Sequence, residues 1–153
     1  MISLGELRSQ IIACRRCPRL VRNREAAAQD PPRRYRGERY WAKPIPGFGE
    51  PRARLLIVGL APAAHGGNRT GRMFTGDGSA VWLARALYES EFASQPTSTH
   101  RNDGFTLRDA WITAAVRCAP PANKPSLDEF RRCQPFLEAE LGRLRNVRVV
   151  VAL

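Results

Sequence analysis

The chain has 153 residues, of which 43% are hydrophobic and 25% charged, and its formal net charge is +11. This composition excludes an intrinsically disordered chain, and no apolar run approaches the roughly 20 residues that a membrane helix needs. The N-terminus, MISLGELRSQ, lacks the basic and apolar segments of a secretory signal. We therefore expect one globular domain over residues 1–153, located in the cytoplasm.

Arginine supplies 23 of the 25 basic residues. Guanidinium groups pair with phosphates in a two-pronged geometry and stack on bases, so the charge favours a polyanionic partner such as nucleic acid. Ten basic residues, against three acidic ones, lie between Arg15 and Lys43. An arginine-rich coding bias would give the same overall excess, so charge alone leaves both explanations open.

Four cysteines form a pattern typical of a metal site. Cys14 and Cys17 make a C-x2-C pair, and fourteen residues separate Cys118 from Cys133. Disulfides are rare in cytoplasmic proteins, so we expect four thiolates that bind a metal and join the two halves of the domain. Zinc and an iron–sulfur cluster both fit this spacing. The alternative is two buried thiols and a chance C-x2-C pair.

The hydrophobic pattern predicts helices that alternate with strands. The capping box Ser3-x-x-Glu6 opens a first helix, which ends near Cys14. Residues 22–53, rich in Arg, Pro and Gly, predict an irregular excursion; with the C-x2-C pair it covers residues 14–53. A strand over 55–60, a helix capped by Ser79 and a polar loop over 93–104 follow. A strand over 110–117 and a loop over 118–125 come next. The capping box Ser126-x-x-Glu129 then opens a helix with Phe130, Cys133, Leu137, Leu141 and Leu144 on one stripe, and a strand covers 147–153.

This order of elements implies an α/β fold with parallel strands and right-handed crossovers. Ligands bind such sheets beyond the carboxyl ends of the strands. The loops that follow the first two strands therefore open onto one crevice. The chain stops inside the apolar run Val149–Leu153, so we expect an incomplete domain that continues beyond residue 153.

The loop after the first strand, residues 59–77, reads GLAPAAHGGNRTGRMFTGD. Its glycines allow backbone N–H groups to approach a ligand, but it matches neither the dinucleotide fingerprint nor the phosphate-binding loop. His65, Phe74 and Asp77 would each, alone, more often be structural. Together in one loop beyond a strand they predict a site, where a ring stacks on a flat ligand and a carboxylate orients water.

This loop resembles the first active-site motif of the uracil-DNA glycosylase superfamily, and its opening Gly-Leu-Ala-Pro-Ala resembles family 5, the broad-specificity type B enzymes. The segments VRCAPPAN over 116–123, CQPFL over 133–137 and YWAKPIPGFG over 40–49 are similar to further blocks of that family. The resemblance implies a three-layer α/β/α fold with a central, mainly parallel sheet that lacks its C-terminal part. It also implies a 4Fe–4S cluster on Cys14, Cys17, Cys118 and Cys133.

The family flips a damaged nucleotide out of DNA and hydrolyses its N-glycosidic bond, which starts base excision repair. The resemblance implies catalytic roles for Asp77, toward water or the sugar cation, and for Asn123, toward base or water. The backbone N–H groups of residues 59–64 would receive the oxygen anion of the base. The implied base-binding residues are Gly59, Ala61, Ala63, His65, Asn68 and Phe74. The expected partner is double-stranded DNA containing uracil or another deaminated base, bound by a monomer at the nucleoid and not at a membrane.

Three departures from the family pattern carry information. Leu60 and Ala61 are apolar where many members have a polar or acidic residue, which shifts the catalytic burden to Asp77. Thr113-Ala114 lacks the Asn that family 4 places after Thr, so the pocket should admit bases such as hypoxanthine. The chain has no His-Pro-Ser motif, so we expect these 153 residues alone to have little glycosylase activity.

Two other functions compete with this interpretation. A non-catalytic iron–sulfur module that binds DNA and recognises lesions would keep the cysteines, the arginines and Phe74. A nucleotide hydrolase would need acidic metal ligands in the crevice, where only Asp77 is obvious.

Overall fold

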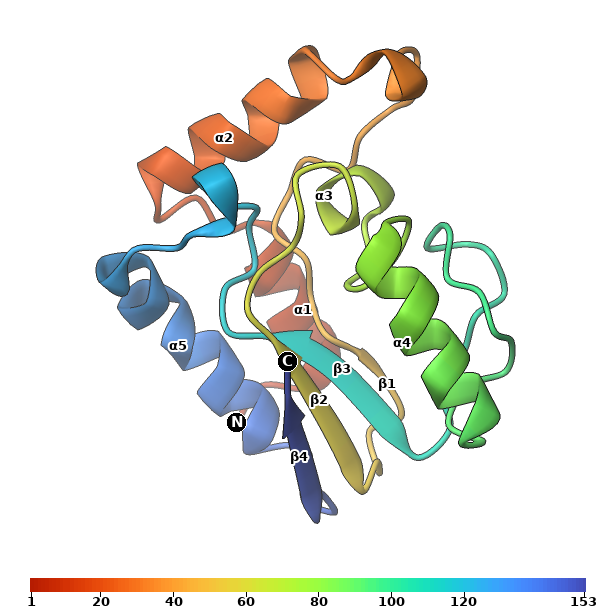
Figure 1. Cartoon of the computed structure of the whole chain (residues 1–153). Coiled ribbons are helices and arrows are strands. Elements are labelled where there is room, and N and C mark those ends of the chain that lie inside the picture. The colour runs from red at the N-terminus through yellow and green to blue at the C-terminus, as the bar shows by residue number, and fades with distance from the viewer.

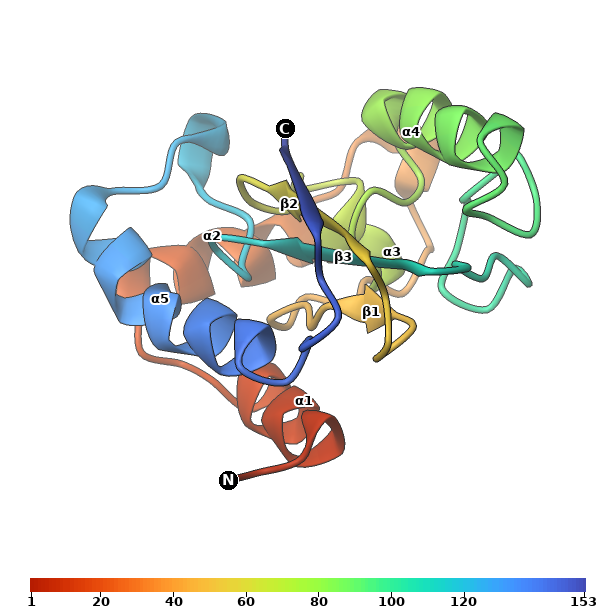
Figure 2. The same ribbon diagram turned by 90° about the horizontal axis from the view of Figure 1, so that it is seen from below.

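The computed structural model describes residues 1–153 and contains a mixed four-stranded sheet with helices on both faces (Figures 1 and 2). The strand order is β1-β3-β2-β4, with β2 parallel to both of its neighbours and β1 antiparallel to β3. The strands are β1 (Phe48–Gly49), β2 (Leu55–Gly59), β3 (Ala110–Ala114) and β4 (Val149–Ala152). The predicted α/β fold with a mainly parallel sheet is confirmed; the short strand β1 was not predicted.

Helices complete three layers. In Figure 2, α4 lies on one side of the sheet, and α1 and α5 lie on the other. The helices are α1 (Leu4–Ile12), α2 (Pro18–Gln29), α3 (Gly67–Thr70), α4 (Gly78–Glu89) and α5 (Leu127–Leu141), with 3-10 turns η1 (Arg33–Tyr35) and η2 (Pro121–Asn123). None of these helices is long and apolar enough to cross a membrane.

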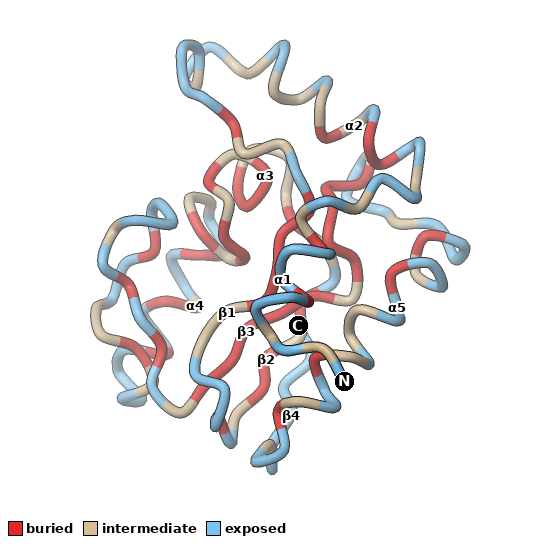
Figure 3. The backbone as a smooth tube through the Cα atoms, turned by 180° about the vertical axis from the view of Figure 1, so that it is seen from behind, coloured by how far each residue is buried: buried red, intermediate tan, exposed pale blue.

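Successive side chains of β2 point to opposite faces of the sheet, so the core has one part on each face. Leu56 packs with Trp111 and Leu144 on the side of α1 and α5, whereas Ile57 packs with Ile112 in the larger cluster that includes α4. β3 is buried along its whole length, while every residue of β4 is exposed (Figure 3). Leu144, predicted on the stripe of the last helix, lies after the end of α5.

The N-cap residues in the structure confirm two predicted helix starts and correct the cap of a third helix. Ser3 and Ser126 each accept from the backbone three residues on, as predicted. The cap of α4, however, is Asp77 and not Ser79: Asp77 Oδ1 accepts from Ala80 N (2.9 Å) and from the Ser79 hydroxyl (2.7 Å). A carboxylate there satisfies an otherwise unpaired N–H and also favours the positive end of the helix dipole.

The prediction of irregular structure over residues 14–53 is wrong for its first half. Pro18 occupies the first turn of α2, where its missing N–H is no loss, and Leu20, Val21 and Arg24 are buried. Because a buried arginine replaces an apolar residue on the inner face, the sequence shows only a weak hydrophobic stripe. From Asp30 to Gly47 the chain is irregular apart from η1, as predicted.

A buried ion pair fixes the loop after β3. Arg117 and Glu140 are 1% and 2% exposed in their side chains and approach to 2.6 Å. Glu140 also accepts from the Thr113 hydroxyl (2.5 Å) and from Gly47 N (3.1 Å). The carboxylate therefore joins α5 to β3 and to the segment before β1, and it sets the position of the loop that carries the third cysteine.

We expect Glu140→Ala to lower the free energy of unfolding by about 3–5 kcal/mol, because it leaves the Arg117 cation buried without a partner. Urea denaturation measures this. Glu138→Ala is the matched control on the same helix, since Glu138 is exposed, and it should change stability by less than about 0.5 kcal/mol. Equal effects of the two substitutions would contradict the assignment.

Candidate functional site

A crevice of about 730 Å³ opens at the carboxyl ends of the parallel strands. The loop after β2 and the loop after β3 both line it, as predicted. Four predicted site residues face it: Ala63, His65, Asp77 and Asn123. The structure adds Arg34, Tyr35 and Arg69, together with residues 96–99, to this lining. For Arg34 and Tyr35, the only sequence signal was their position in the Arg-rich segment over residues 22–53.

Asp77 holds one carboxylate oxygen free at this crevice. Its Oδ1 caps α4, whereas its Oδ2 has no hydrogen-bond partner within the protein and lies directly against Gly66. A Cβ at position 66 would overlap that oxygen. The glycine is therefore required for the carboxylate to reach its place, and the free oxygen can accept from water or a ligand.

His65 is held as a neutral ring. Its Nδ1 lies 2.7 Å from the Tyr40 hydroxyl, and its ring stacks on Tyr35 with centroids 6.2 Å apart. Burial lowers the pKa of His65, and the nearby cations Arg34 and Arg69 lower it further. A neutral imidazole beside two guanidinium groups can exchange hydrogen bonds with a base without adding charge.

Backbone donors complete the crevice. The N–H groups of Ala63, Ala64 and His65 have no acceptor within the protein. Because small side chains flank them, these N–H groups can approach an oxygen of a ligand closely. The arrangement is a set of preorganised donors beside a carboxylate.

Phe74 and Gly59 lie together at the end of β2. Phe74 has a left-handed backbone conformation (φ 47°), and its ring packs on Gly59, where a Cβ would come within 2.8 Å of two ring carbons. Phe74 is partly buried against the core. The ring therefore lies where the loop of residues 59–77 leaves the sheet.

Four of the six predicted base-binding residues do not line the crevice: Gly59 and Phe74, described above, and also Ala61 and Asn68. Ala61 packs against the cluster that contains Cys118 and Cys133. Asn68 is 1% exposed, and its amide donates to the backbone carbonyls of Arg24 (3.1 Å) and Ala64 (3.2 Å). Asn68 thus braces the loop and does not line the crevice.

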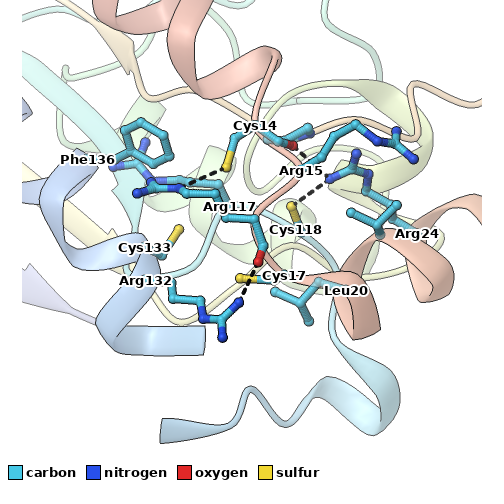
Figure 4. A pocket seen from close by; sticks show the side chains of 13 residues that line it. Cys14, Arg15, Cys17, Leu20, Arg24, Arg117, Cys118, Arg132, Cys133 and Phe136 are labelled. Atoms are coloured by element: carbon cyan, nitrogen blue, oxygen red, sulfur yellow. Dashed lines mark hydrogen bonds between the residues drawn. The ribbon is translucent and has the colours of Figure 1, made fainter. Parts of the chain in front are cut away.

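A second cavity contains all four cysteines (Figure 4). Cys14 and Cys17 lie between α1 and α2, Cys118 follows β3, and Cys133 lies in α5. The structure thus brings together side chains 119 positions apart, as the spacing predicted. No group of three or more His, Cys, Asp or Glu side chains converges on a single-ion position.

The surroundings of these thiols are positive. Five arginines and no carboxylate line the cavity: Arg15, Arg16, Arg24, Arg117 and Arg132. Arg24 is 2% exposed, forms no ion pair with a carboxylate, and donates to Cys118 Sγ at 3.1 Å. A buried cation is costly unless an anion balances it. Burial raises the pKa of the Cys118 thiol to about 11, which keeps this thiol protonated near neutral pH.

The fold and the two cavities define a mixed α/β protein with a ligand crevice at its strand ends and a four-thiol site beside it. Residues 46–153 match the family model described as the Uracil DNA glycosylase superfamily, and the chain belongs to that superfamily. The resemblance of the loop over residues 59–77 is thereby confirmed.

Comparison with curated relatives shows which types of enzyme in the superfamily the chain is similar to. The chain is 54% identical over 143 residues to the type-5 uracil-DNA glycosylase of Thermus thermophilus, covering 94% of this chain and 64% of the relative. It is 50% identical over 152 residues to the type-5 enzyme of Mycobacterium leprae, covering 99% and 66%. A type-4 uracil-DNA glycosylase of Pyrobaculum aerophilum is 31% identical over 113 residues, covering 73% and 50%. The chain thus spans between 57% and 66% of the length of these two type-5 relatives and of three further ones.

We expect Gly66→Ala to lower the midpoint of thermal unfolding by several degrees, because the new methyl group displaces the Asp77 carboxylate and weakens the cap of α4. Gly78→Ala is the matched control: position 78 lies at the start of α4, a methyl group added there would have no neighbour within 4 Å, and the change should be neutral or stabilising. Equal midpoints for the two variants would sink this account of the loop.

Proposed function

We propose that the protein is a DNA glycosylase that flips uracil, and other deaminated bases such as hypoxanthine, from double-stranded DNA and hydrolyses the N-glycosidic bond to start base excision repair. We propose that it acts as a monomer in the cytoplasm, at the nucleoid. The carrying observation is that the free oxygen of Asp77 and the free N–H groups of Ala63 and Ala64 belong to one crevice. Membership of the superfamily supports the assignment.

The reaction develops two opposite charges, and the crevice has a group for each. The departing base becomes an anion, which the N–H groups of Ala63, Ala64 and His65 would stabilise. The sugar becomes cation-like, and Asp77 would stabilise it or orient the attacking water. Asn123, exposed on the opposite loop with a left-handed backbone (φ 57°), would contact the base or the water.

The base itself would be held by shape and stacking. The neutral His65 would exchange a hydrogen bond with it, and Phe74 would stack on a base that reaches past the lining residues to the end of β2. The Thr113 hydroxyl already donates to Glu140, and Ala114 is fully buried, so β3 offers no side chain to read the edge of uracil. This arrangement supports a pocket that also admits hypoxanthine, because selectivity needs a polar group that a wrong base would leave unpaired.

The DNA partner is supported by charge at the rim of the crevice. Arg34 and Arg69 line the crevice, and both lie over the ring of Tyr35, at 4.8 and 4.0 Å from its centroid. Because the chain has a net charge of +11, its contacts with DNA phosphates would drive most of the binding, and the affinity for DNA would fall steeply as salt is raised.

The four-thiol cavity fits a 4Fe–4S cluster. All four cysteines line this one cavity, and in such a cluster each cysteine would bind a different iron. Cys14, Cys17, Cys118 and Cys133 would hold the cluster, and Arg24 would pair with its negative charge. When bound, the cluster would supply a covalent link between α2, α5 and the loop after β3.

A second candidate is a non-catalytic iron–sulfur module that binds lesions in DNA. The cysteine cavity and the arginines at the crevice, which lesion binding alone would also need, are compatible with it. Because residues 1–153 contain no His-Pro pair, we propose that these residues alone bind uracil-containing DNA but release little free base. A single-turnover assay of the full-length protein on a uracil–guanine duplex distinguishes the two candidates, since only a glycosylase releases free uracil from the DNA.

We expect Asp77→Asn to slow single-turnover excision by the full-length protein about 100-fold, because the charge that supports the sugar cation is lost. Asparagine caps helices as well as aspartate does, so the thermal midpoint should stay within a few degrees. Asp128→Asn, an exposed carboxylate in the first turn of α5, is the control and should leave the rate unchanged. An unchanged rate in Asp77→Asn would remove this residue from the mechanism.

Protein purified without oxygen should be brown and contain about four iron atoms per chain. Cys133→Ser should lose most of this iron, because one ligand of a buried site is removed. Arg131→Ser is the neighbouring control, since Arg131 is exposed and does not line the cavity. Colourless protein with one zinc ion per chain would overturn the assignment of the cluster.

A further inference from the structure

Two buried polar side chains connect the cysteine cavity to the crevice. Arg24 comes from α2 and is 2% exposed, and Asn68 comes from α3 and is 1% exposed. Neither lies where a base would touch it. Their hydrogen bonds, however, form one unbroken path between the sulfur atoms and the backbone donors of the crevice.

Arg24 makes the first half of this path. Its Nη1 donates to Cys118 Sγ (3.1 Å) and to the Cys14 carbonyl (3.4 Å), and its Nε donates to the Ala42 carbonyl (3.2 Å). Figure 4 shows its guanidinium pointing at Cys118. One side chain thus joins two of the cysteine segments to the segment at residues 40–42.

Asn68 makes the second half. Its Nδ2 uses one hydrogen for the Arg24 carbonyl (3.1 Å) and the other for the Ala64 carbonyl (3.2 Å). Its backbone N–H donates to the Ala63 carbonyl (3.1 Å), and its carbonyl accepts from Ala42 N (3.0 Å). A carboxamide is the smallest side chain that offers two donors, so neither aspartate nor leucine could replace it here.

We propose that Arg24 and Asn68 are positioning residues through which the four-cysteine site fixes the backbone of residues 63–65, the donors that would receive the base oxygen. The proposal rests on the proposed function of these donors. It predicts that loss of the metal loosens the crevice loop, although the loop contains no metal ligand. A preorganised donor set loses its effect when it can move by about 1 Å.

Hydrogen exchange tests the path without any need for catalysis. In the full-length protein, removal of iron by a chelator should speed exchange of the hydrogen-bonded amides of residues 68–70 at least tenfold, while β3 (residues 110–114) stays protected. Unchanged exchange in 68–70 would overturn the proposal. Loss of protection in β3 as well would also overturn it, because the metal would then stabilise the whole fold and not this path.

The variant Asn68→Ala should give the same fast exchange in 68–70 with iron content and visible absorption at the wild-type level. Iron removal should then add little, since the path is already broken. Asn23→Ala is the matched control for exchange: Asn23 donates from the same helix as Arg24 to the Ala119 carbonyl (2.9 Å), which braces the loop after β3 and not the loop of residues 59–77. Equal exchange in both variants would contradict the path.

Excision rates separate this proposal from the function itself. We expect Asn68→Ala to lower the single-turnover rate about tenfold with little change in DNA affinity. Absence of excision by the wild type together with coupled exchange would sink the proposed function alone. Normal excision by Asn68→Ala would sink the positioning role alone.

Discussion

The cysteine cavity is built around a buried positive charge, Arg24, that lies against the sulfur of Cys118. Arg24 is almost fully enclosed and has carbonyl oxygens and a thiol sulfur, but no carboxylate, as acceptors. An unbalanced cation in such a place would cost several kcal/mol. In the proposed iron–sulfur site, metal-bound thiolates would remove that cost. The same guanidinium joins α2 to Cys118, which follows β3, and to the Cys14 and Ala42 carbonyls. The Arg24 carbonyl in turn accepts from Asn68 in the loop of residues 59–77.

The crevice follows from the parallel sheet. β2 and β3 end side by side, so the loops that leave them meet, although about 50 residues separate the two strands. The chain uses small residues at this point. Gly59 admits the Phe74 ring, and Gly66 admits the Asp77 carboxylate. Close approach of backbone and carboxylate at Gly66 places donors and an acceptor in one crevice, as the proposed cleavage of a glycosidic bond would need.

Local signals in the sequence predicted much of this, and long-range contacts account for what was missed. The capping boxes and apolar runs gave the helices α1 and α5 and the three parallel strands, because these patterns act within a few residues. The helix α2 was missed because its buried Arg24 finds its partners 94 residues away. Asn68 was assigned to the base and braces the loop, since nothing in its neighbours reveals the contact with Arg24. Ser79 was predicted to cap α4, but the cap is Asp77, whose second carboxylate oxygen faces the crevice.

The most direct test is a crystal structure of the full-length protein on DNA that carries a non-cleavable deoxyuridine analogue, with anomalous data at the iron edge. The account predicts an iron signal enclosed by Cys14, Cys17, Cys118 and Cys133 and within reach of Arg24. It also predicts the uracil in the crevice, with an oxygen on the N–H groups of Ala63 and Ala64. A signal from zinc alone, or a base bound away from these donors, would contradict it.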